Sequence, residues 1–316
     1  MLIYAGLFAL LMAGELGLFD TRPPAGEDSD DVLPPDDEAG APGPAEDLDL
    51  TDDDREDPEA GEYSTEVRGT EASDALTAGA QRDVAWYLGD GDDALDASDG
   101  ADFADGGAGD DVLYMRAGSD IALGGAGNDR IDAGVGDDRV SGEAGDDRLT
   151  GNGGDDTLFG GAGDDTVTGG SGNDLVVGND GDDVLSGLAA DTANTNLGEF
   201  DGIDTLLGGA GDDLLLLGAQ DIGLGGDGCD TFRLDDTDPD LTGPAQVLDF
   251  DPDQDMLELL YAPQLDAAGQ PMAPLIEIAG NGQGNWTLTV DGDTVAQITL
   301  ANAQELTLDM IRLIPA

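Results

Sequence analysis

A nine-residue repeat with one apolar position sets the strongest limit on what this chain can fold into. Eleven units run without a gap from Leu88 to Ser186, and four more follow a 12-residue insertion at 187–198. The eighth position is apolar in fourteen of the fifteen units, within a segment otherwise made mainly of Gly and Asp; Gly223 is the exception. One inward residue in nine predicts a three-residue strand, and stacked units of this kind predict a solenoid.

The remaining six residues of each unit predict a turn. The consensus is G-G-x-G-x-D-x-U-x, with U apolar, as in GGAGDDVLY at Gly106 and GGAGNDRID at Gly124. Glycine at positions 1, 2 and 4 permits positive φ and lets backbone carbonyls face a common centre. Aspartate at position 6 adds a carboxylate. This density of hard oxygen atoms suits Ca²⁺, which takes six to eight oxygen ligands, whereas Zn²⁺ prefers nitrogen and sulfur.

Composition excludes several classes of function. The 316 residues include 72 acidic and ten basic residues, all of the latter Arg, which gives a net charge of −62. Such a charge argues against a nucleic-acid partner, whose phosphates need Lys and Arg. The absence of His and Lys excludes a Ser-His-Asp relay and a Schiff base. The single Cys229 excludes an intrachain disulfide.

The repeat resembles the RTX (repeat-in-toxin, hemolysin-type) calcium-binding nonapeptide. The resemblance covers about Gly69–Arg233. Six units keep all of G-G-x-G-x-D, namely those that begin at Gly106, Gly124, Gly160, Gly169, Gly208 and Gly225. The resemblance implies an all-β fold, a right-handed parallel β-roll in which two nonapeptides make one coil. It also implies multiple calcium ions between turns that stack on the same edge.

The resemblance assigns the ligands residue by residue, because alternate units share an edge of such a roll. The first edge stacks Asp93, Asp111, Asp129, Asp147, Asp165, Asp183, Asp213 and Asp230. The second carries Asp102, Asp120, Asp138, Asp156, Asp174, Asp204 and Asp221. Several turns on the second edge have lost glycines, so ions are expected there mainly between Asp138, Asp156 and Asp174. The glycines expected at the metal sites are Gly107, Gly109, Gly125, Gly127, Gly161 and Gly163.

Electrostatics predicts that folding requires the metal. Residues 88–233 hold 34 acidic residues and five arginines, a balance of −29. Carboxylates at about the strand spacing of ~5 Å repel by roughly 0.8 kcal/mol in water and about 3 kcal/mol at an effective dielectric of 20. One small aliphatic side chain per nine residues cannot offset this repulsion. Calcium binding and folding are therefore expected to be one event.

The flanking segments predict different organisation. Residues 1–19 are apolar apart from Glu15 and fit a membrane-associating helix, an atypical signal, or a helix packed on the protein. Residues 20–68 combine Pro with Asp and Glu and predict a disordered linker. The roll is assigned to 69–233, and 234–316 to a small C-terminal antiparallel β cap with an export signal.

The C-terminal segment offers three local predictions. The run NWTLTVDGDTVAQITL predicts a hairpin that turns at Asp291–Gly292. Leu214, Leu216 and Leu217 are expected to point outward as an apolar strip. Alternate aspartates that either hold another ion or form a plain acidic turn are Asp249, Asp251, Asp253 and Asp255.

The sequence therefore predicts a secreted calcium-binding protein rather than an enzyme. In the RTX family, enzymes carry a catalytic domain before the roll, and here only about 68 His-free residues precede it. The resemblance implies export by a type I secretion apparatus and no small-molecule substrate. The alternative is a surface adhesion or matrix protein tethered to a membrane by residues 1–19.

Overall fold

The part of the chain that the structure describes is almost entirely β-strand. The structure, a computed structural model, describes residues 63, 65–78, 83–187, 202–236, 243–265, 270–282, 284–301 and 305–315. The chain divides into units 1–55 and 56–316, and all described residues belong to the second. Within them, every regular element is a strand except the 3₁₀ helix Leu308–Met310. The helix expected in 1–19 and most of the linker expected in 20–68 lie outside the described residues.

No helix among the described residues has the length and apolar character needed to span a membrane.

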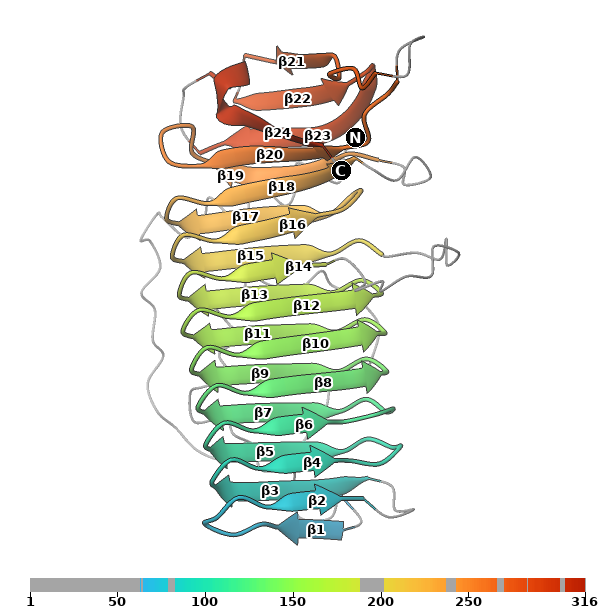
Figure 1. The fold of residues 1–316 in the computed structure, drawn as a ribbon, viewed down its shortest axis with the longest axis vertical. Coiled ribbons are helices and arrows are strands. Elements are labelled where there is room, and N and C mark those ends of the chain that lie inside the picture. The colour runs from blue at the N-terminus through green and yellow to red at the C-terminus, as the bar shows by residue number, and fades with distance from the viewer. Residues whose placement is uncertain are drawn as a thin grey trace, which may run out of the picture. The chain divides into compact units, whose positions relative to one another are not determined.

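The strands form two sheets that alternate along the chain (Figure 1). The first sheet has the order β1 (Thr65–Arg68), β3 (Val84–Asp90), β5 (Phe103–Ala108), β7 (Ile121–Ala126), β9 (Arg139–Ala144), β11 (Thr157–Ala162), β13 (Leu175–Asp180), β15 (Thr205–Ala210), β17 (Ile222–Asp227), β19 (Ala245–Phe250), β23 (Asp293–Leu300), β22 (Asn285–Val290) and β21 (Ile276–Gly280). The second has the order β2 (Ala75–Thr77), β4 (Ala94–Asp96), β6 (Val112–Tyr114), β8 (Arg130–Val135), β10 (Arg148–Gly153), β12 (Thr166–Ser171), β14 (Val184–Ser186), β16 (Leu214–Leu217), β18 (Thr231–Asp236), β20 (Met256–Tyr261) and β24 (Ile311–Pro315).

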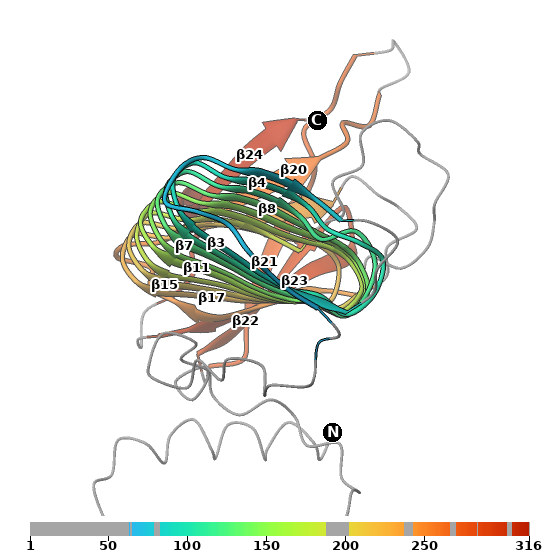
Figure 2. The same cartoon turned by 90° about the horizontal axis from the view of Figure 1, so that it is seen from below.

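Two nonapeptides make each coil. Leu149 of β10 pairs with Ile131 of β8 and Val167 of β12, so parallel partners are 18 residues apart. Across the insertion, Val176 of β13 pairs with Leu206 of β15, and the ladder continues without a break. Viewed along the stack, the two sheets face each other and successive coils superimpose (Figure 2). The expected parallel β-solenoid is confirmed.

The core is the line of eighth-position side chains between the two sheets. All fourteen apolar ones, from Leu95 to Phe232, are at most 1% exposed. At the exception, Gly223, the core space is filled by Leu217 of the preceding strand β16, because a β-carbon on Gly223 would meet the side-chain methyls of Leu217. Leu217 is therefore buried, and the prediction that it points outward is wrong. Leu215 points inward, and alternation along a strand returns Leu217 to the same side.

Many strands are longer than the three residues predicted. β8, β10 and β12 each span six residues, because the parallel ladder continues through the first three positions of the next nonapeptide. The glycines at positions 1 and 2 therefore belong to the ladder as well as to the turn. Stacking places each turn directly over the turn two units earlier, and this vertical alignment positions the candidate site.

The two parallel sheets continue beyond the last nonapeptide. β19 and β20 pair in parallel with β17 and β18, and β24 pairs in parallel with β20. β23 also pairs in parallel, with β19, and among the described strands antiparallel pairing is confined to β21–β22 and β22–β23. The β22–β23 turn at Asp291 (φ 52°) and Gly292 (φ 100°) confirms the predicted hairpin. The buried carboxylate of Glu258 accepts hydrogen bonds from Arg233 and Arg312 at 2.6–2.9 Å, which ties β18, β20 and β24 together.

Candidate metal centre

The aspartates at position 6 form one buried row along each edge of the roll, here called the inner rows. Each is at most 3% exposed. Within a row, the Oδ1 atom of one aspartate accepts a hydrogen bond from the backbone N–H of the inner-row aspartate one coil earlier. The N–H of Asp129 donates to Asp147 at 2.7 Å, and that of Asp147 to Asp165 at 2.7 Å. The two rows contain the residues that the sequence assigns to the two edges, in the same order.

The second carboxylate oxygen of most inner-row aspartates is buried without a hydrogen bond. Among the described residues, this holds for Oδ2 of Asp93, Asp111, Asp120, Asp129, Asp138, Asp147, Asp156, Asp165, Asp183, Asp213 and Asp230. A buried carboxylate oxygen without a partner costs more free energy than a lost neutral hydrogen bond. Repetition of the same unpaired atom along both rows indicates that a cation belongs there.

Backbone carbonyls converge on these oxygens. A β-carbon on Gly142, at position 1, would collide with Asp147 Oδ2 and with the carbonyl oxygen of Gly160 in the next coil. At position 2, a β-carbon on Gly125 would collide with the carbonyl oxygen of Gly107 in the coil before. Glycine is favoured at both positions, because these oxygens occupy the space of a side chain. Carboxylate and carbonyl oxygens thus face the gap between successive turns.

The donor set fits calcium. Among the described residues, no group of three or more His, Cys, Asp or Glu side chains comes together. A metal between these turns would therefore take carboxylate oxygens together with backbone carbonyls. The residues that would hold it are inner-row aspartates and the glycines of the same turns, including Gly109, Gly127, Gly161 and Gly163, where an added β-carbon would collide with carbonyl oxygens of the preceding coil. A set of hard oxygens alone is what Ca²⁺ selects, and it would neutralise the stacked carboxylates.

The inner-row carboxyls bind protons unusually tightly in the metal-free fold. Burial raises the pKa of Asp120 and Asp156 to about 8, and that of Asp111 and Asp165 to about 7. The hydrogen bond from the neighbouring coil lowers each pKa, and the adjacent inner-row carboxylates raise it. Burial and repulsion between neighbouring carboxylates destabilise the ionised form of these groups, and a bound cation would offset both effects.

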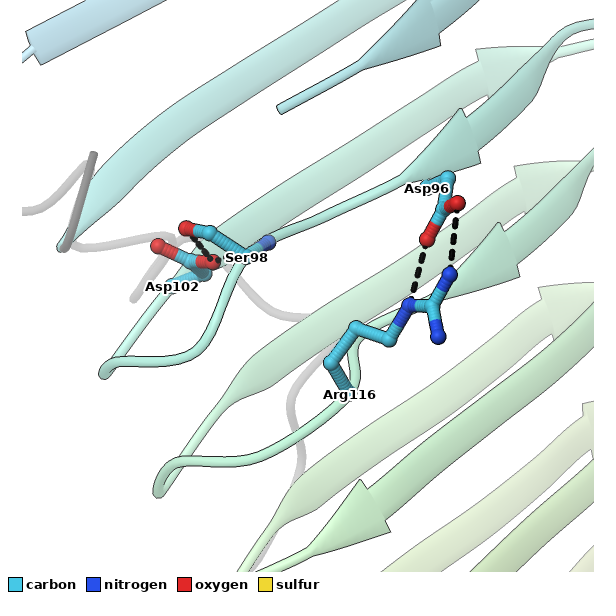
Figure 3. A network of polar contacts seen from close by, with 4 residues as sticks. All are labelled: Asp96, Ser98, Asp102 and Arg116. Carbon is cyan, nitrogen blue, oxygen red and sulfur yellow. Dashed lines mark hydrogen bonds and ion pairs between the residues drawn. The ribbon is translucent and has the colours of Figure 1, made fainter. Parts of the chain in front are cut away.

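The turn of Asp120 has the same geometry as the regular turns although it has lost two glycines. Arg116 stands at position 2 with φ 85°, in the region that glycine normally occupies, and Met115 is fully buried. The guanidinium of Arg116 points outward and donates to Asp96 at 2.5 and 2.6 Å (Figure 3), and this hydrogen bond lowers the pKa of Asp96. The expected weakness of this part of the second edge is therefore not visible in its backbone, because an L-residue adopts the required conformation.

A second ladder, at position 5, was not anticipated from the sequence. Its side chains are exposed and point along the stack in the opposite sense. The N–H of Asp164 donates to Asp146 Oδ1 at 3.0 Å, and that of Asp182 donates to Asp164 at 3.0 Å. Aspartate or asparagine fills position 5 in most units, and this frequency was the available signal. These outer-row residues align the turns without placing a carboxylate between them.

The alternate aspartates after the last nonapeptide do not converge on one point. Asp249 accepts from the N–H groups of Gly225 and Gly226 at 3.0 and 3.1 Å. Asp255 accepts from the N–H groups of Asp230 and Asp251 at 3.0 and 2.7 Å. Both alternatives, a further ion and a plain acidic turn, stay predictions.

The fold and these rows define the protein as a parallel β-solenoid with carboxylates stacked between its coils. The model of the RTX calcium-binding nonapeptide repeat matches the chain four times, at residues 87–122, 116–149, 150–185 and 200–232. The array is therefore one of RTX calcium-binding repeats, as the resemblance indicated. Together the four matches cover 132 of the 316 residues, which is less than half of the chain, so they identify the repeat array rather than the whole protein.

Among solved structures, the chain is similar to the AlgE6R3 subunit from the Azotobacter vinelandii mannuronan C5-epimerase. The two are 26% identical over 52% of this chain and 77% of that one, with a TM-score of 0.26. No curated protein matches the chain.

Two adjacent aspartates test the inner row. Asp147→Asn should weaken calcium binding and shift the calcium midpoint of folding upward by roughly tenfold, because it removes a ligand charge between two coils. Asp146→Asn removes the same charge from the outer row but keeps an oxygen that accepts from Asp164, so its midpoint should stay close to that of the wild type. Calcium titration followed by circular dichroism compares the two variants. Equal shifts would show that net charge, not position, controls binding.

Proposed function

We propose that this protein is an exported, non-catalytic calcium-binding scaffold that folds when it meets extracellular calcium. The observation that supports this most strongly is the repetition of buried, unpaired Oδ2 atoms in the inner rows. A row of such oxygens makes the stability of the roll depend on divalent cations. The chain has one cysteine and so no intrachain disulfide with which to stabilise itself outside the cell.

Export as a loose chain fits the same dependence. Extracellular calcium modules work at millimolar calcium, far above the calcium levels to which cytosolic sensors respond. A roll that needs calcium stays unfolded in the cytosol and folds after passage through a type I secretion apparatus, the route that RTX repeats suggest. The scaffold role is supported by the chemistry of the chain, which has no His or Lys.

Fractionation of the producing cells with metal analysis tests the proposal. The protein should accumulate in the medium or on the cell surface, and protein purified from there should contain several calcium ions per chain by mass spectrometry, with magnesium and zinc near background. A chain that stays in the cytosol in folded form without calcium would refute the proposal. A cell-surface fraction released only by detergent would favour the tethered alternative.

A further inference from the structure

The two inner rows end in turns that differ from those between them. The first-edge row begins at Asp74, whose N–H donates to Asp93 at 2.6 Å, and ends at Asp255, which accepts from Asp230. The second-edge row begins at Asp102 and ends at Asp221, which accepts from Asp204 at 3.0 Å. These four end aspartates share one feature that the unpaired interior positions lack.

In each end turn, a donor from the same turn reaches Oδ2, the atom that most interior turns leave unpaired. Thr70 donates to Asp74 with its N–H at 2.7 Å and its hydroxyl at 2.9 Å. Ser98 donates to Asp102 with its N–H at 3.1 Å and its hydroxyl at 3.0 Å (Figure 3).

The two C-terminal ends use backbone groups alone. The N–H of Asp251 donates to Asp255 Oδ2 at 2.7 Å, and the N–H of Gly218 donates to Asp221 Oδ2 at 2.7 Å. The donor stands four residues before the aspartate in three of the end turns and three residues before it in the shortened unit. All four carboxylates are therefore satisfied by the chain itself.

The backbone at position 2 separates the two kinds of turn. Arg116, Glu143 and Asn152 occupy position 2 of interior turns with φ between 73° and 85°, and the glycines at this position also have a positive φ. Thr70 and Ser98, both within the described residues, do not have a positive φ. Their N–H groups turn toward the carboxylate instead of toward the next coil. A hydroxyl residue in this conformation supplies two donors where an interior turn leaves an oxygen for a cation.

We propose that these four turns are calcium-independent end caps, which confine the ions to the interior of each row. This inference rests on the proposed calcium-binding function and deepens it. The physical reason is that an end turn has a ligand-bearing turn on one side only. A hydrogen bond within the turn needs no second coil, and it uses the Oδ2 atom that a cation in the gap shared with the next coil would otherwise take. In the folded roll, the caps satisfy the end carboxylates without a bound cation.

A variant that removes one cap tests the proposal, because it should bind more calcium than the wild type. Ser98→Gly removes the hydroxyl and restores the residue type of an interior turn, so the full-length variant should bind about one more calcium ion per chain than the wild type. The matched control is Arg116→Gly, at position 2 of the next turn on the same edge, where Asp120 is already unpaired and the stoichiometry should not change. Calcium titration against a competing chelator measures both.

A subtractive pair covers the case in which Ser98→Gly does not fold. Asp102→Asn should leave the number of bound ions unchanged, whereas Asp120→Asn should lose about one. No gain in a folded Ser98→Gly variant, or equal losses in the subtractive pair, would overturn the caps while leaving calcium binding intact. A wild-type chain that binds no calcium would instead refute the proposed function.

Discussion

Removal of calcium should convert residues 88–232 from β-structure to largely coil. The stacked carboxylates of the inner rows repel one another, and each of many Oδ2 atoms is buried without a partner. At tenfold excess over its Kd, each independent site stabilises the fold by about 1.4 kcal/mol, so seven sites give ~10 kcal/mol. That equals the stability of a typical domain. Far-ultraviolet circular dichroism in chelator and in millimolar Ca²⁺ measures the change, which should be cooperative in calcium.

Two controls separate ligation from screening. Sodium chloride at matched ionic strength weakens the repulsion between exposed charges but supplies no divalent cation for the carboxylates to coordinate, so it should restore little β-structure. Magnesium should act less well than calcium, because it prefers an octahedron and retains its waters. Equal β content in chelator and in calcium, or full recovery in sodium chloride, would contradict the prediction.

Acid should stabilise the metal-free roll. The pKa of Asp120 and Asp156 in the fold is raised to about 8, and that of Asp111 to about 7, chiefly by burial, whereas an unfolded Asp titrates near 3.9. The folded state therefore binds more protons than the unfolded state between these values. The stabilisation is fully present below about pH 4 and is lost as the pH rises through about 6–8. Protons and calcium compete for the same oxygens, so the calcium midpoint should rise as the pH falls.

This dependence can be measured on protein that has been freed of calcium with a chelating resin and is then titrated between pH 8.5 and pH 5 at constant salt. A resin is preferable to a chelator, whose own protonation changes its affinity for calcium. The β signal without calcium should increase toward pH 5, and the calcium required for half-folding should increase with it. A metal-free protein that gains structure as the pH rises would contradict the burial of the inner rows. Asp146→Asn is a suitable reference, because its outer-row side chain is exposed.

Local spacing was sufficient to predict a solenoid in which Leu149 and its equivalents face inward and Asp147 and its equivalents lie in the turn. The two rows followed from the resemblance to the RTX repeat, which implies two units per coil. Two units per coil then places residues 18 apart in contact. The same reasoning failed at Leu217, because a shortened unit changes which side chain fills the core position left by Gly223.

The amino-acid sequence did not reveal the backbone conformation of the turns that have lost glycines. Loss of glycine at Arg116 and at Ser98 looks alike in the sequence, yet the first keeps a positive φ and the second does not. The difference decides whether the carboxylate of the turn stays unpaired, as at Asp120, or accepts two hydrogen bonds, as at Asp102.

The sequence by itself determined the repeat, the inward line of apolar side chains, the oxygen-rich turns and the preference for calcium, because each depends only on residue type and period. The tertiary structure decided where the rows end, which carboxylates lack a partner, and how β19, β20 and β24 continue the sheets beyond the last nonapeptide. These features depend on which coil lies above and below a given turn. The sequence order indicates which turns are neighbours, 17, 18 or 30 residues apart, but not the backbone conformation of each turn or the donors that reach its carboxylate.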